Sequence, residues 1–117
     1  MRTELFIGNE WRKATGGGTI PVVNPATEET LAEVEAASAQ DVDAAVAAAR
    51  ACFDGDAWGG LSARKRGALL YRAGELLQER IKDVATLETQ QNGKPFFESK
   101  IDVAMTVETL KYYAGWA

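Results

Sequence analysis

The first third of the chain alternates apolar and polar residues with the period of β-strands. Gly8-Asn9 separates two short apolar runs, and this pair is typical of the tight turn of a hairpin. Asn24-Pro25 ends a third extended run in a turn. Further on, small apolar residues alternate with glutamates, which predicts a strand with one wet face. The four expected strands are 5–7, 10–12, 19–23 and 30–36.

From Ser38 onward, apolar residues recur with the 3.6-residue period of helices. Ser38-x-x-Asp41 has the pattern of an N-terminal cap, and Ser62 can cap a second helix. Gly93 has the position of a residue that follows a helix end, and Pro95 that of a helix start. We therefore expect helices over 38–53, over 62–92 as one long bent helix or two abutting ones, and over 95–114.

The last expected helix is apolar on two opposite sides, with a more polar stripe between them. A helix of this kind is usually buried between two layers. We therefore expect that the 117 residues are not the whole protein. One side holds Ile101, Met105, Tyr112 and Trp116, the other Val103, Val107 and Leu110, and the stripe Asp102, Thr106, Thr109 and Tyr113.

The composition is that of an ordinary globular protein of one domain or less, because 46% of the 117 residues are apolar and 26% are charged. The chain has no histidine and one cysteine, Cys52. This excludes an intrachain disulfide and every nucleophile paired with histidine, and it argues against a zinc protein. A net charge of −4 argues against a nucleic-acid binder. No apolar run has the length of a membrane span and no secretory signal opens the chain, so we expect a cytoplasmic location.

Four features carry reactive or charged groups, and each favours a structural interpretation. Cys52 lies at the edge of an apolar helix face, where a free cysteine is most often a buried core residue. The glycines 16–18 lack the Lys-Ser/Thr pair and the following helix of a phosphate loop. The basic triplet 64–66 favours a solvated face or an interdomain salt bridge over an anion site. Gln91 and neighbouring carbonyls have the oxygens for a cation site, but helix capping explains the same segment.

Six segments, taken in order, resemble the NAD(P)-dependent aldehyde dehydrogenases. Each motif is moderately specific, and their common order and spacing cover essentially the whole chain. The motifs include the turn Val-Asn-Pro-Ala-Thr, the segment Glu-Thr-x-x-Asn-Gly-Lys-Pro and the segment Tyr-Tyr-Ala-Gly-Trp-Ala. The six segments are 5–11, 23–27, 41–53, 66–72, 88–95 and 112–117.

The resemblance implies an α/β fold that is locally α+β, with an N-terminal β-hairpin and short strands followed by three to four helices. Residues 1–117 would be the N-terminal portion of the family's Rossmann-like cofactor-binding domain, with the catalytic and oligomerisation domains absent from this chain. The complete enzyme would oxidise an aldehyde to a carboxylic acid through a cysteine thioester, with NAD or NADP as cofactor, as a homodimer or homotetramer.

The family's phosphate-binding turn, its glutamate base and its cysteine nucleophile lie beyond Ala117. The resemblance therefore assigns no catalytic and no cofactor-binding residue to this chain. We expect the fragment alone to bind neither NAD nor NADP and to be inactive.

Two groups of residues match functional positions of the family. The backbone oxygens of Val22 and Val23 and the side chain of Gln91 match a monovalent-cation site. Gln91 replaces the usual aspartate, which keeps an oxygen but removes the charge. Asp102 and Thr106 match positions that line the aldehyde entrance tunnel. In addition, Glu28 stands where glycine is common; if that turn needs a positive φ, the side chain costs about 1 kcal/mol.

An alternative from another class remains open at this point. The chain would then be a standalone structural or interaction module built on the same fold piece, with the second apolar side of the last helix as its interface. We expect neither a nucleic acid nor a membrane as partner, because acidic residues outnumber basic ones and no expected helix is both basic and amphipathic.

Overall fold

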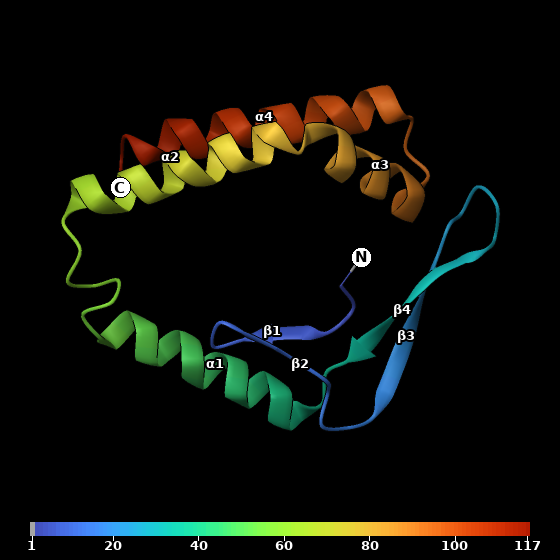
Figure 1. The fold of residues 1–117 in the computed structure, drawn as a ribbon, viewed down its shortest axis with the longest axis horizontal. Helices are drawn as coiled ribbons and strands as arrows, with labels where there is room; N and C mark the ends of the chain where they lie inside the picture. The colour runs from blue at the N-terminus through green and yellow to red at the C-terminus, as the bar shows by residue number, and fades with distance from the viewer. Residues whose placement is uncertain (1) are drawn as a thin grey trace. The chain divides into compact units, whose positions relative to one another are not determined.

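The computed structural model describes residues 2–117, which form two compact units. The first unit contains the residues up to Val23 together with Glu28–Gly60. The second contains Asn24–Thr27 and Leu61–Ala117. The strands and the first helix belong to the first unit, and three further helices belong to the second (Figure 1). The expected mixed α/β class, with short strands followed by three to four helices, is confirmed, and the structure has four helices in residues 2–117.

The first two strands, β1 (Leu5–Ile7) and β2 (Glu10–Arg12), form the expected antiparallel hairpin. Gly8 and Asn9 have φ values of 62° and 67°. A two-residue turn of the mirror-image type requires a positive φ at both positions, and glycine and asparagine tolerate it best. The turn residues therefore fix this hairpin locally.

The next two strands, β3 (Gly18–Val23) and β4 (Thr30–Ala36), pair antiparallel in a separate sheet. The expected wet face of β4 is confirmed at Glu33, which is exposed. It is wrong at Glu35, whose carboxylate accepts a 2.7 Å hydrogen bond from the backbone N–H of Ala14 and is half-buried. A carboxylate bound by a backbone donor can leave the solvent without losing its hydrogen bonds.

The connection between β3 and β4 contains Glu28, which has a φ of 60°. The turn thus needs the left-handed conformation that glycine favours, and the expectation from the sequence is confirmed. A side chain at this position costs about 1 kcal/mol relative to a relaxed backbone.

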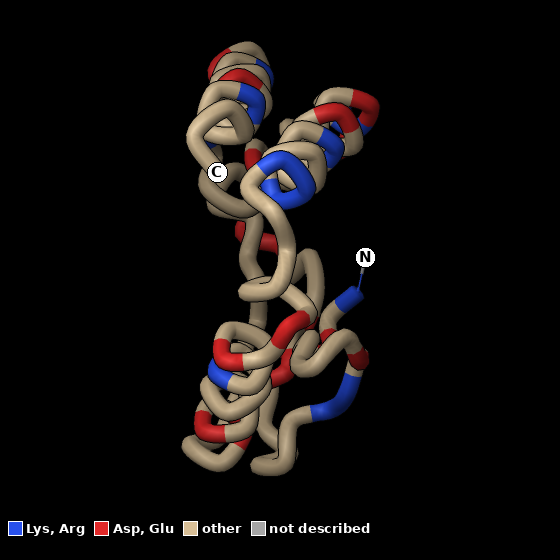
Figure 2. The backbone as a smooth tube through the Cα atoms, turned by 90° about the vertical axis from the view of Figure 1, so that its left-hand side faces the viewer, with Lys and Arg blue, Asp and Glu red and all other residues tan. Residues whose placement is uncertain are grey.

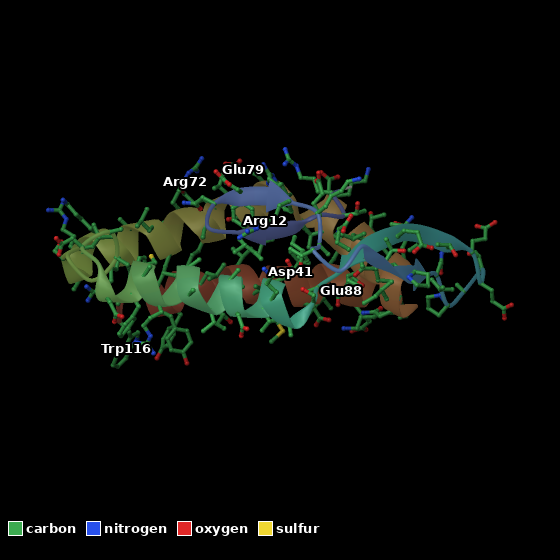
Figure 3. All side chains as sticks on the ribbon, turned by 90° about the horizontal axis from the view of Figure 1, so that it is seen from below. Arg12, Asp41, Arg72, Glu79, Glu88 and Trp116 are labelled. Atoms are coloured by element: carbon green, nitrogen blue, oxygen red, sulfur yellow. The ribbon has the colours of Figure 1, made fainter. Side chains whose placement is uncertain are left out.

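The first helix, α1 (Ala39–Asp54), begins with the expected cap. Ser38 Oγ accepts a hydrogen bond from the Asp41 N–H, and Asp41 accepts one from the Ser38 N–H at 2.9 Å. The carboxylate of Asp41 also accepts a hydrogen bond from the N–H of Thr15 at 3.1 Å, and only 2% of Asp41 is exposed (Figure 3). Hydrogen bonds from the backbone N–H of Ser38, then from its hydroxyl and from Thr15, lower the pKa of Asp41 against the opposing effect of burial. This carboxylate ties the loop before β3 to the start of α1.

The apolar stripe of α1 is only partly covered by the described residues. Cys52 is exposed, so the expectation that it is a core residue is wrong. Small residues of α1, three alanines and Cys52, border the hollow shared with β1, so the helix presents its smaller residues to that strand. The large residues of the stripe that remain exposed are Val42, Val46 and Phe53.

The second unit starts with two abutting helices, α2 (Ala63–Glu79) and α3 (Ile81–Asn92), joined at Arg80. Ser62 caps α2 by accepting a hydrogen bond from the Lys65 N–H, as expected. Arg72 on α2 forms exposed ion pairs with Glu75 and Glu79, the latter at 3.6 Å (Figure 3). Both pairs lie within α2 and contribute little to stability. The two helices instead pack against the helix that follows.

That helix, α4 (Phe96–Ala114), begins after Pro95 and runs antiparallel beside α2, with α3 also packed against it (Figure 1). Two glycines of α2 permit the close approach. A Cβ at Gly67 would collide with the carbonyl oxygen of Ala114, and a Cβ at Gly74 would lie 3.3 Å from Cγ of Lys111. The backbones of α2 and α4 therefore meet where α2 has no side chains.

The small core of the second unit lies on one side of α4. Val103 and Val107 are 4% and 2% exposed, and Ala85 of α3 is fully buried. Ser99 is also fully buried, and its hydroxyl shares a 2.9 Å hydrogen bond with the Thr89 hydroxyl of α3. One of the two apolar sides that the sequence predicts for this helix is thus packed inside the unit.

Candidate functional site

Lys94, in the turn between α3 and α4, pairs with one carboxylate on each of these helices. Its ammonium lies 3.3 Å from a carboxylate oxygen of Glu88 on α3 and also pairs with the carboxylate of Asp102 on α4. The hydrogen bond with Asp102 raises the pKa of Lys94, and Lys94 lowers the pKa of Asp102. Both shifts favour the charged forms, so neither residue is suited to exchange a proton near neutral pH.

Asp102 and Thr106, the residues expected in a substrate tunnel, lie one turn apart on α4. The carboxylate of Asp102 is occupied by Lys94, and the hydroxyl of Thr106 donates a 2.9 Å hydrogen bond to the backbone carbonyl of Asp102. Thr106 is exposed and Asp102 half-buried. The arrangement places a fixed ion pair beside an exposed hydroxyl, and it leaves the tunnel assignment itself a prediction.

The expected cation ligands come from different parts of the fold. Val22 and Val23 end β3 in the first unit, whereas Gln91 lies in the last turn of α3 in the second. The turn that follows Val23 does belong to the second unit, and there Pro25 lies against Gly93: a Cβ on that glycine would be 2.9 Å from Cγ of Pro25. Gly93 has a φ of 76°, as a left-handed residue after a helix does.

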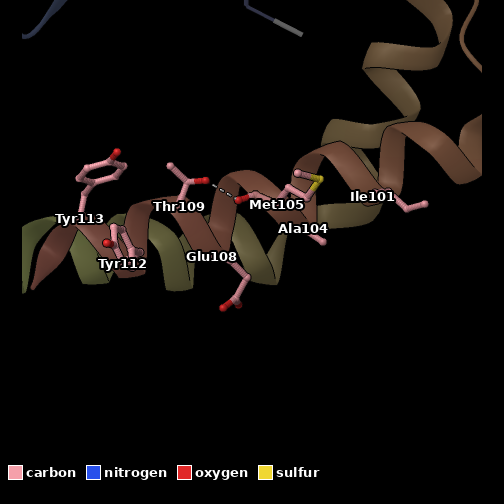
Figure 4. A pocket seen from close by; sticks show the side chains of 7 residues that line it. All are labelled: Ile101, Ala104, Met105, Glu108, Thr109, Tyr112 and Tyr113. Carbon is pink, nitrogen blue, oxygen red and sulfur yellow. Dashed lines mark hydrogen bonds between the residues drawn. The ribbon is translucent and has the colours of Figure 1, made fainter.

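An apolar hollow lies along α4, on the side that faces away from α2 and α3 (Figure 4). It has a volume of about 490 Å³, and all its lining side chains come from this one helix. Ile101, Met105, Glu108 and Tyr112 line it, and the ring of Trp116 lies 6.2 Å from that of Tyr112. We call these five residues the outer face of α4, although Trp116 lies just beyond the last residue of that helix.

The sequence placed Met105 on an apolar side of the last helix without assigning it to the tunnel, and it gave Glu108 no role, although both line this hollow. The signal was present for Met105, because the apolar residues on that side recur at helical spacing. No sequence pattern singles out Glu108, because a single carboxylate among apolar neighbours matches no known motif. The structure also places Asp102 and Thr106 outside the set of residues that line the hollow.

No other described feature has the make-up of a catalytic or metal site. Along the helices of residues 2–117, Lys and Arg are interspersed with Asp and Glu, without a continuous basic stripe (Figure 2). Within the same residues, no three His, Cys, Asp or Glu side chains gather where a metal ion would bind. None of the described helices has the length and hydropathy needed to cross a membrane.

Comparisons with known proteins cover nearly the whole chain. Residues 11–117 match the aldehyde dehydrogenase family. The chain is 44% identical to the mitochondrial aldehyde dehydrogenase of Rattus norvegicus over 116 residues, which are 97% of this chain and 22% of that protein. It is 44% identical to aldehyde dehydrogenase, cytosolic 1, of Elephantulus edwardii, covering 100% of this chain and 24% of that protein.

Solved structures agree with the sequence matches. A G224D mutant of the aldehyde dehydrogenase from Bacillus cereus superposes with a TM-score of 0.95 at 40% identity, over 99% of this chain and 24% of that one. The expected match to part of the aldehyde dehydrogenase fold is therefore confirmed. The chain spans about a quarter of the length of these relatives, and it belongs to the aldehyde dehydrogenase family.

Proposed function

We propose that this chain is the N-terminal segment of an aldehyde dehydrogenase whose complete form oxidises an aldehyde to a carboxylic acid with NAD or NADP. The observation that carries the proposal is the superposition of 99% of this chain on 24% of a Bacillus cereus aldehyde dehydrogenase with a TM-score of 0.95. A structure of that enzyme as an NAD+ complex has the same similarity and supports NAD as the cofactor of the complete protein. In this proposal, residues 1–117 form the N-terminal portion of the cofactor-binding domain, and the catalytic and oligomerisation domains lie outside this chain.

The residues of this chain do not by themselves fit a dinucleotide. The glycine run that ends at Gly18 is followed by β3 rather than by a helix, so it lacks the helix N-terminus on which a pyrophosphate rests. The exposed Cys52 has no histidine to activate it, since the chain contains none. We therefore propose that the chain alone binds no NAD or NADP and is inactive.

The contribution of this chain to substrate binding would come from α4. Asp102 and Thr106 are proposed to line the aldehyde entrance tunnel of the complete enzyme, with Lys94 neutralising the carboxylate of Asp102. Replacement of Thr106 by valine in the complete enzyme should then change KM for the aldehyde more than kcat. An unchanged KM for short and long aldehydes would count against the assignment.

A monovalent-cation site is proposed at the backbone oxygens of Val22 and Val23 and the side-chain oxygen of Gln91. What supports it is the match of these three positions to the family's cation site. Without the usual carboxylate the site should be weak. Exchange of potassium for a large organic cation should lower the stability of the complete enzyme, and Gln91→Asp should increase that dependence; a stability independent of the cation would contradict the site.

The decisive experiment replaces the matching segment of the rat mitochondrial relative with this chain. The isolated chain should form no NADH from an aldehyde and NAD+, whereas the chimera should form it at a rate near that of the parent enzyme. NADH production by the isolated chain would contradict its inactivity. A folded chimera without activity would contradict the proposal that the chain is part of such an enzyme.

The complete protein is further proposed to be a homodimer or homotetramer located in the cytoplasm. The compartment rests on the sequence alone, because the relatives include mitochondrial and cytosolic proteins. A standalone interaction module remains the second candidate function, favoured by one observation: Met105 and Trp116 on the outer face of α4 are 63% and 75% exposed.

A further inference from the structure

Asn92 and Gly93 form an asparagine–glycine pair at the end of α3. The other two asparagines of the sequence differ in the residue that follows, because Asn9 precedes glutamate and Asn24 precedes proline. An asparagine loses its side-chain amide when the backbone nitrogen of the next residue attacks its side-chain carbonyl carbon. Glycine favours this attack, since it has no Cβ and its backbone is the least restricted, whereas proline has no N–H to lose. The sequence thus contains one pair that is chemically prone to deamidation and two internal comparisons.

The structure leaves this pair accessible to water. Asn92 is the last residue of α3, and both Asn92 and Gly93 are exposed. Gly93 has a φ of 76°, the left-handed conformation of a residue that follows a helix end. Water and base can therefore reach the reacting groups without passing through packed side chains.

The carbonyl group that would be attacked is already polarised. Oδ1 of Asn92 accepts a 2.8 Å hydrogen bond from the backbone N–H of Lys94. Negative charge develops on this oxygen during the attack, and a backbone donor that already points at it stabilises that charge. The turn after α3 thus activates the side chain of Asn92 as an electrophile.

The attacking nitrogen, in contrast, is held by the end of the helix. The N–H of Gly93 donates a 2.9 Å hydrogen bond to the carbonyl of Thr89, so the nitrogen must leave this bond before it can lose its proton. The ion pair between Lys94 and Glu88, at 3.3 Å, ties the turn back to α3 and opposes this opening. Helix ends open locally at a low cost in free energy. The cap therefore slows the reaction without preventing it.

We propose that Asn92 is a deamidation site whose rate is set by the opening of the last turn of α3. In the open turn, solvent base removes the proton of the Gly93 nitrogen, and this nitrogen forms a bond with Cγ of Asn92. The bond from Cγ to the side-chain nitrogen breaks, and ammonia leaves after taking up a proton from solvent. Water then opens the resulting cyclic imide at either of its carbonyls and gives aspartate or isoaspartate. The net reaction consumes water and releases ammonia, and it needs no oxidant or cofactor.

The product changes the charge of the turn. A new carboxylate appears at the C-terminal end of α3, where the helix dipole disfavours negative charge. It also follows directly on a segment in which Lys94 already pairs with Glu88 and Asp102. The modified chain should therefore be less stable at the junction of α3 and α4. This inference goes beyond the proposed function and does not depend on it, because the reaction needs only this chain and water.

The test incubates the chain, and separately its chimera with the rat relative, in mildly alkaline buffer. Mass spectrometry of the peptides follows the three asparagines and separates aspartate from isoaspartate. Asn92 should convert several-fold faster than Asn9, and Asn24 should not convert measurably. Conversion of Asn92 no faster than that of Asn9 would overturn the proposal. An intact Asn92 in the folded proteins, under conditions in which the urea-unfolded chain converts, would overturn it as well.

A pair of variants tests the control by the turn. Glu88→Gln removes the ion pair that resists opening, and it should speed the conversion by about twofold to fivefold, as expected for one partly exposed pair. Glu79→Gln is the matched control, because it removes the same charge from an ion pair with Arg72 inside α2. It should leave the rate unchanged. Equal rates in the two variants would overturn the proposal that the turn sets the rate.

Asn92→Gln supplies the unreactive comparison, because its longer side chain must close a larger ring. Release of ammonia should fall to background in this variant, and an unchanged release would contradict the assignment to Asn92. Gly93→Ala is unsuitable as a test, since its Cβ would lie 2.9 Å from Cγ of Pro25 and the φ of 76° would strain the helix end.

Discussion

The two sides of α4 carry similar apolar residues, yet their surroundings differ completely. On the inner side, Val103 and Val107 are 4% and 2% exposed. On the outer side, Met105 and Tyr112 are 63% and 61% exposed. Hydrophobicity alone therefore did not select which side is packed inside the second unit.

The selection comes from the neighbouring helix and from polar groups. Gly67 and Gly74 remove side chains from α2 along the line where it meets α4, so the backbones approach closely on the inner side. The hydroxyls of Thr89 and Ser99 satisfy each other there at 2.9 Å. The outer side carries Glu108 instead, which needs water or a cation. Shape and polar satisfaction, rather than apolar content, distinguish the two sides.

The largest effect is expected from a substitution that disrupts the packing of α2 against the inner side of α4. Gly67→Ala should destabilise the chain by about 3 kcal/mol, because the new Cβ collides with backbone that cannot move without separating α2 from α4. Gly74→Ala is the matched control. Its Cβ would lie 3.3 Å from Cγ of Lys111 and 3.4 Å from the carbonyl oxygen of Val107, which small shifts relieve, so it should cost clearly less than Gly67→Ala. Urea unfolding of both variants measures the difference; equal free energies of unfolding would refute the close-approach argument.

A pair of truncations compares the sides themselves. Val107→Ala should cost about 2 kcal/mol, since it leaves a cavity in a packed core. Met105→Ala should change the free energy of unfolding of the isolated chain by less than about 0.5 kcal/mol, because its side chain is mostly in water. In the complete enzyme, the loss of unfolding free energy caused by Met105→Ala should be larger than in the isolated chain. Similar costs for both variants in the isolated chain would mean that the outer side is already covered.

Hydroxyl groups give a smaller contrast of the same kind. Ser99→Ala should cost about 1 kcal/mol, because it leaves the partly buried Thr89 hydroxyl without this partner. Thr109→Ala on the exposed side should be close to neutral, since that hydroxyl only bonds back to the carbonyl of Met105. Thermal unfolding followed by circular dichroism ranks the two; a larger loss for Thr109→Ala would contradict the burial pattern.

The smallest effect concerns pH and the Lys94 ion pairs at the start of α4. Lys94 lowers the pKa of Asp102 in the folded chain. The ion pair therefore adds to the free energy of unfolding above the ordinary carboxyl pKa of about 4, and this stabilisation is lost as the pH falls through the pKa of Asp102 in the folded chain. Because the pKa of Lys94 is raised, its stabilising effect on the folded chain is lost only at strongly alkaline pH. Wild type should thus be slightly more stable than Asp102→Asn at pH 7 and equal to it in strong acid. A difference that persists in acid would show that the charge is not responsible.

Much of the fold was predictable because its determinants are local. Gly8-Asn9 specifies a hairpin turn, Ser38 and Ser62 cap helices, and Gly93 ends one. Each of these acts through residues two to four positions away, which a single sequence displays. The positive φ of Glu28 was predictable only through the family resemblance.

What could not be predicted depends on distant partners. Cys52 was expected in the core; it borders the hollow between α1 and β1 beside three alanines, but no side chain fills that hollow and Cys52 remains exposed. Glu35 was expected in water, and a backbone N–H from the loop before β3 binds it. In the candidate site, Asp102 was singled out without its partner Lys94, because a pairing eight residues apart across a helix start has no sequence signature.

One measurement tests most directly whether the outer face of α4 is covered by the rest of an aldehyde dehydrogenase. A cysteine introduced by Met105→Cys, in a background with Cys52→Ser, is labelled with a maleimide in the isolated chain and in the chimera with the rat relative, and mass spectrometry reads each site separately. The account predicts labelling at least about tenfold slower in the folded chimera, with no such change for Lys100→Cys. Equal labelling rates at position 105 in both proteins would contradict it.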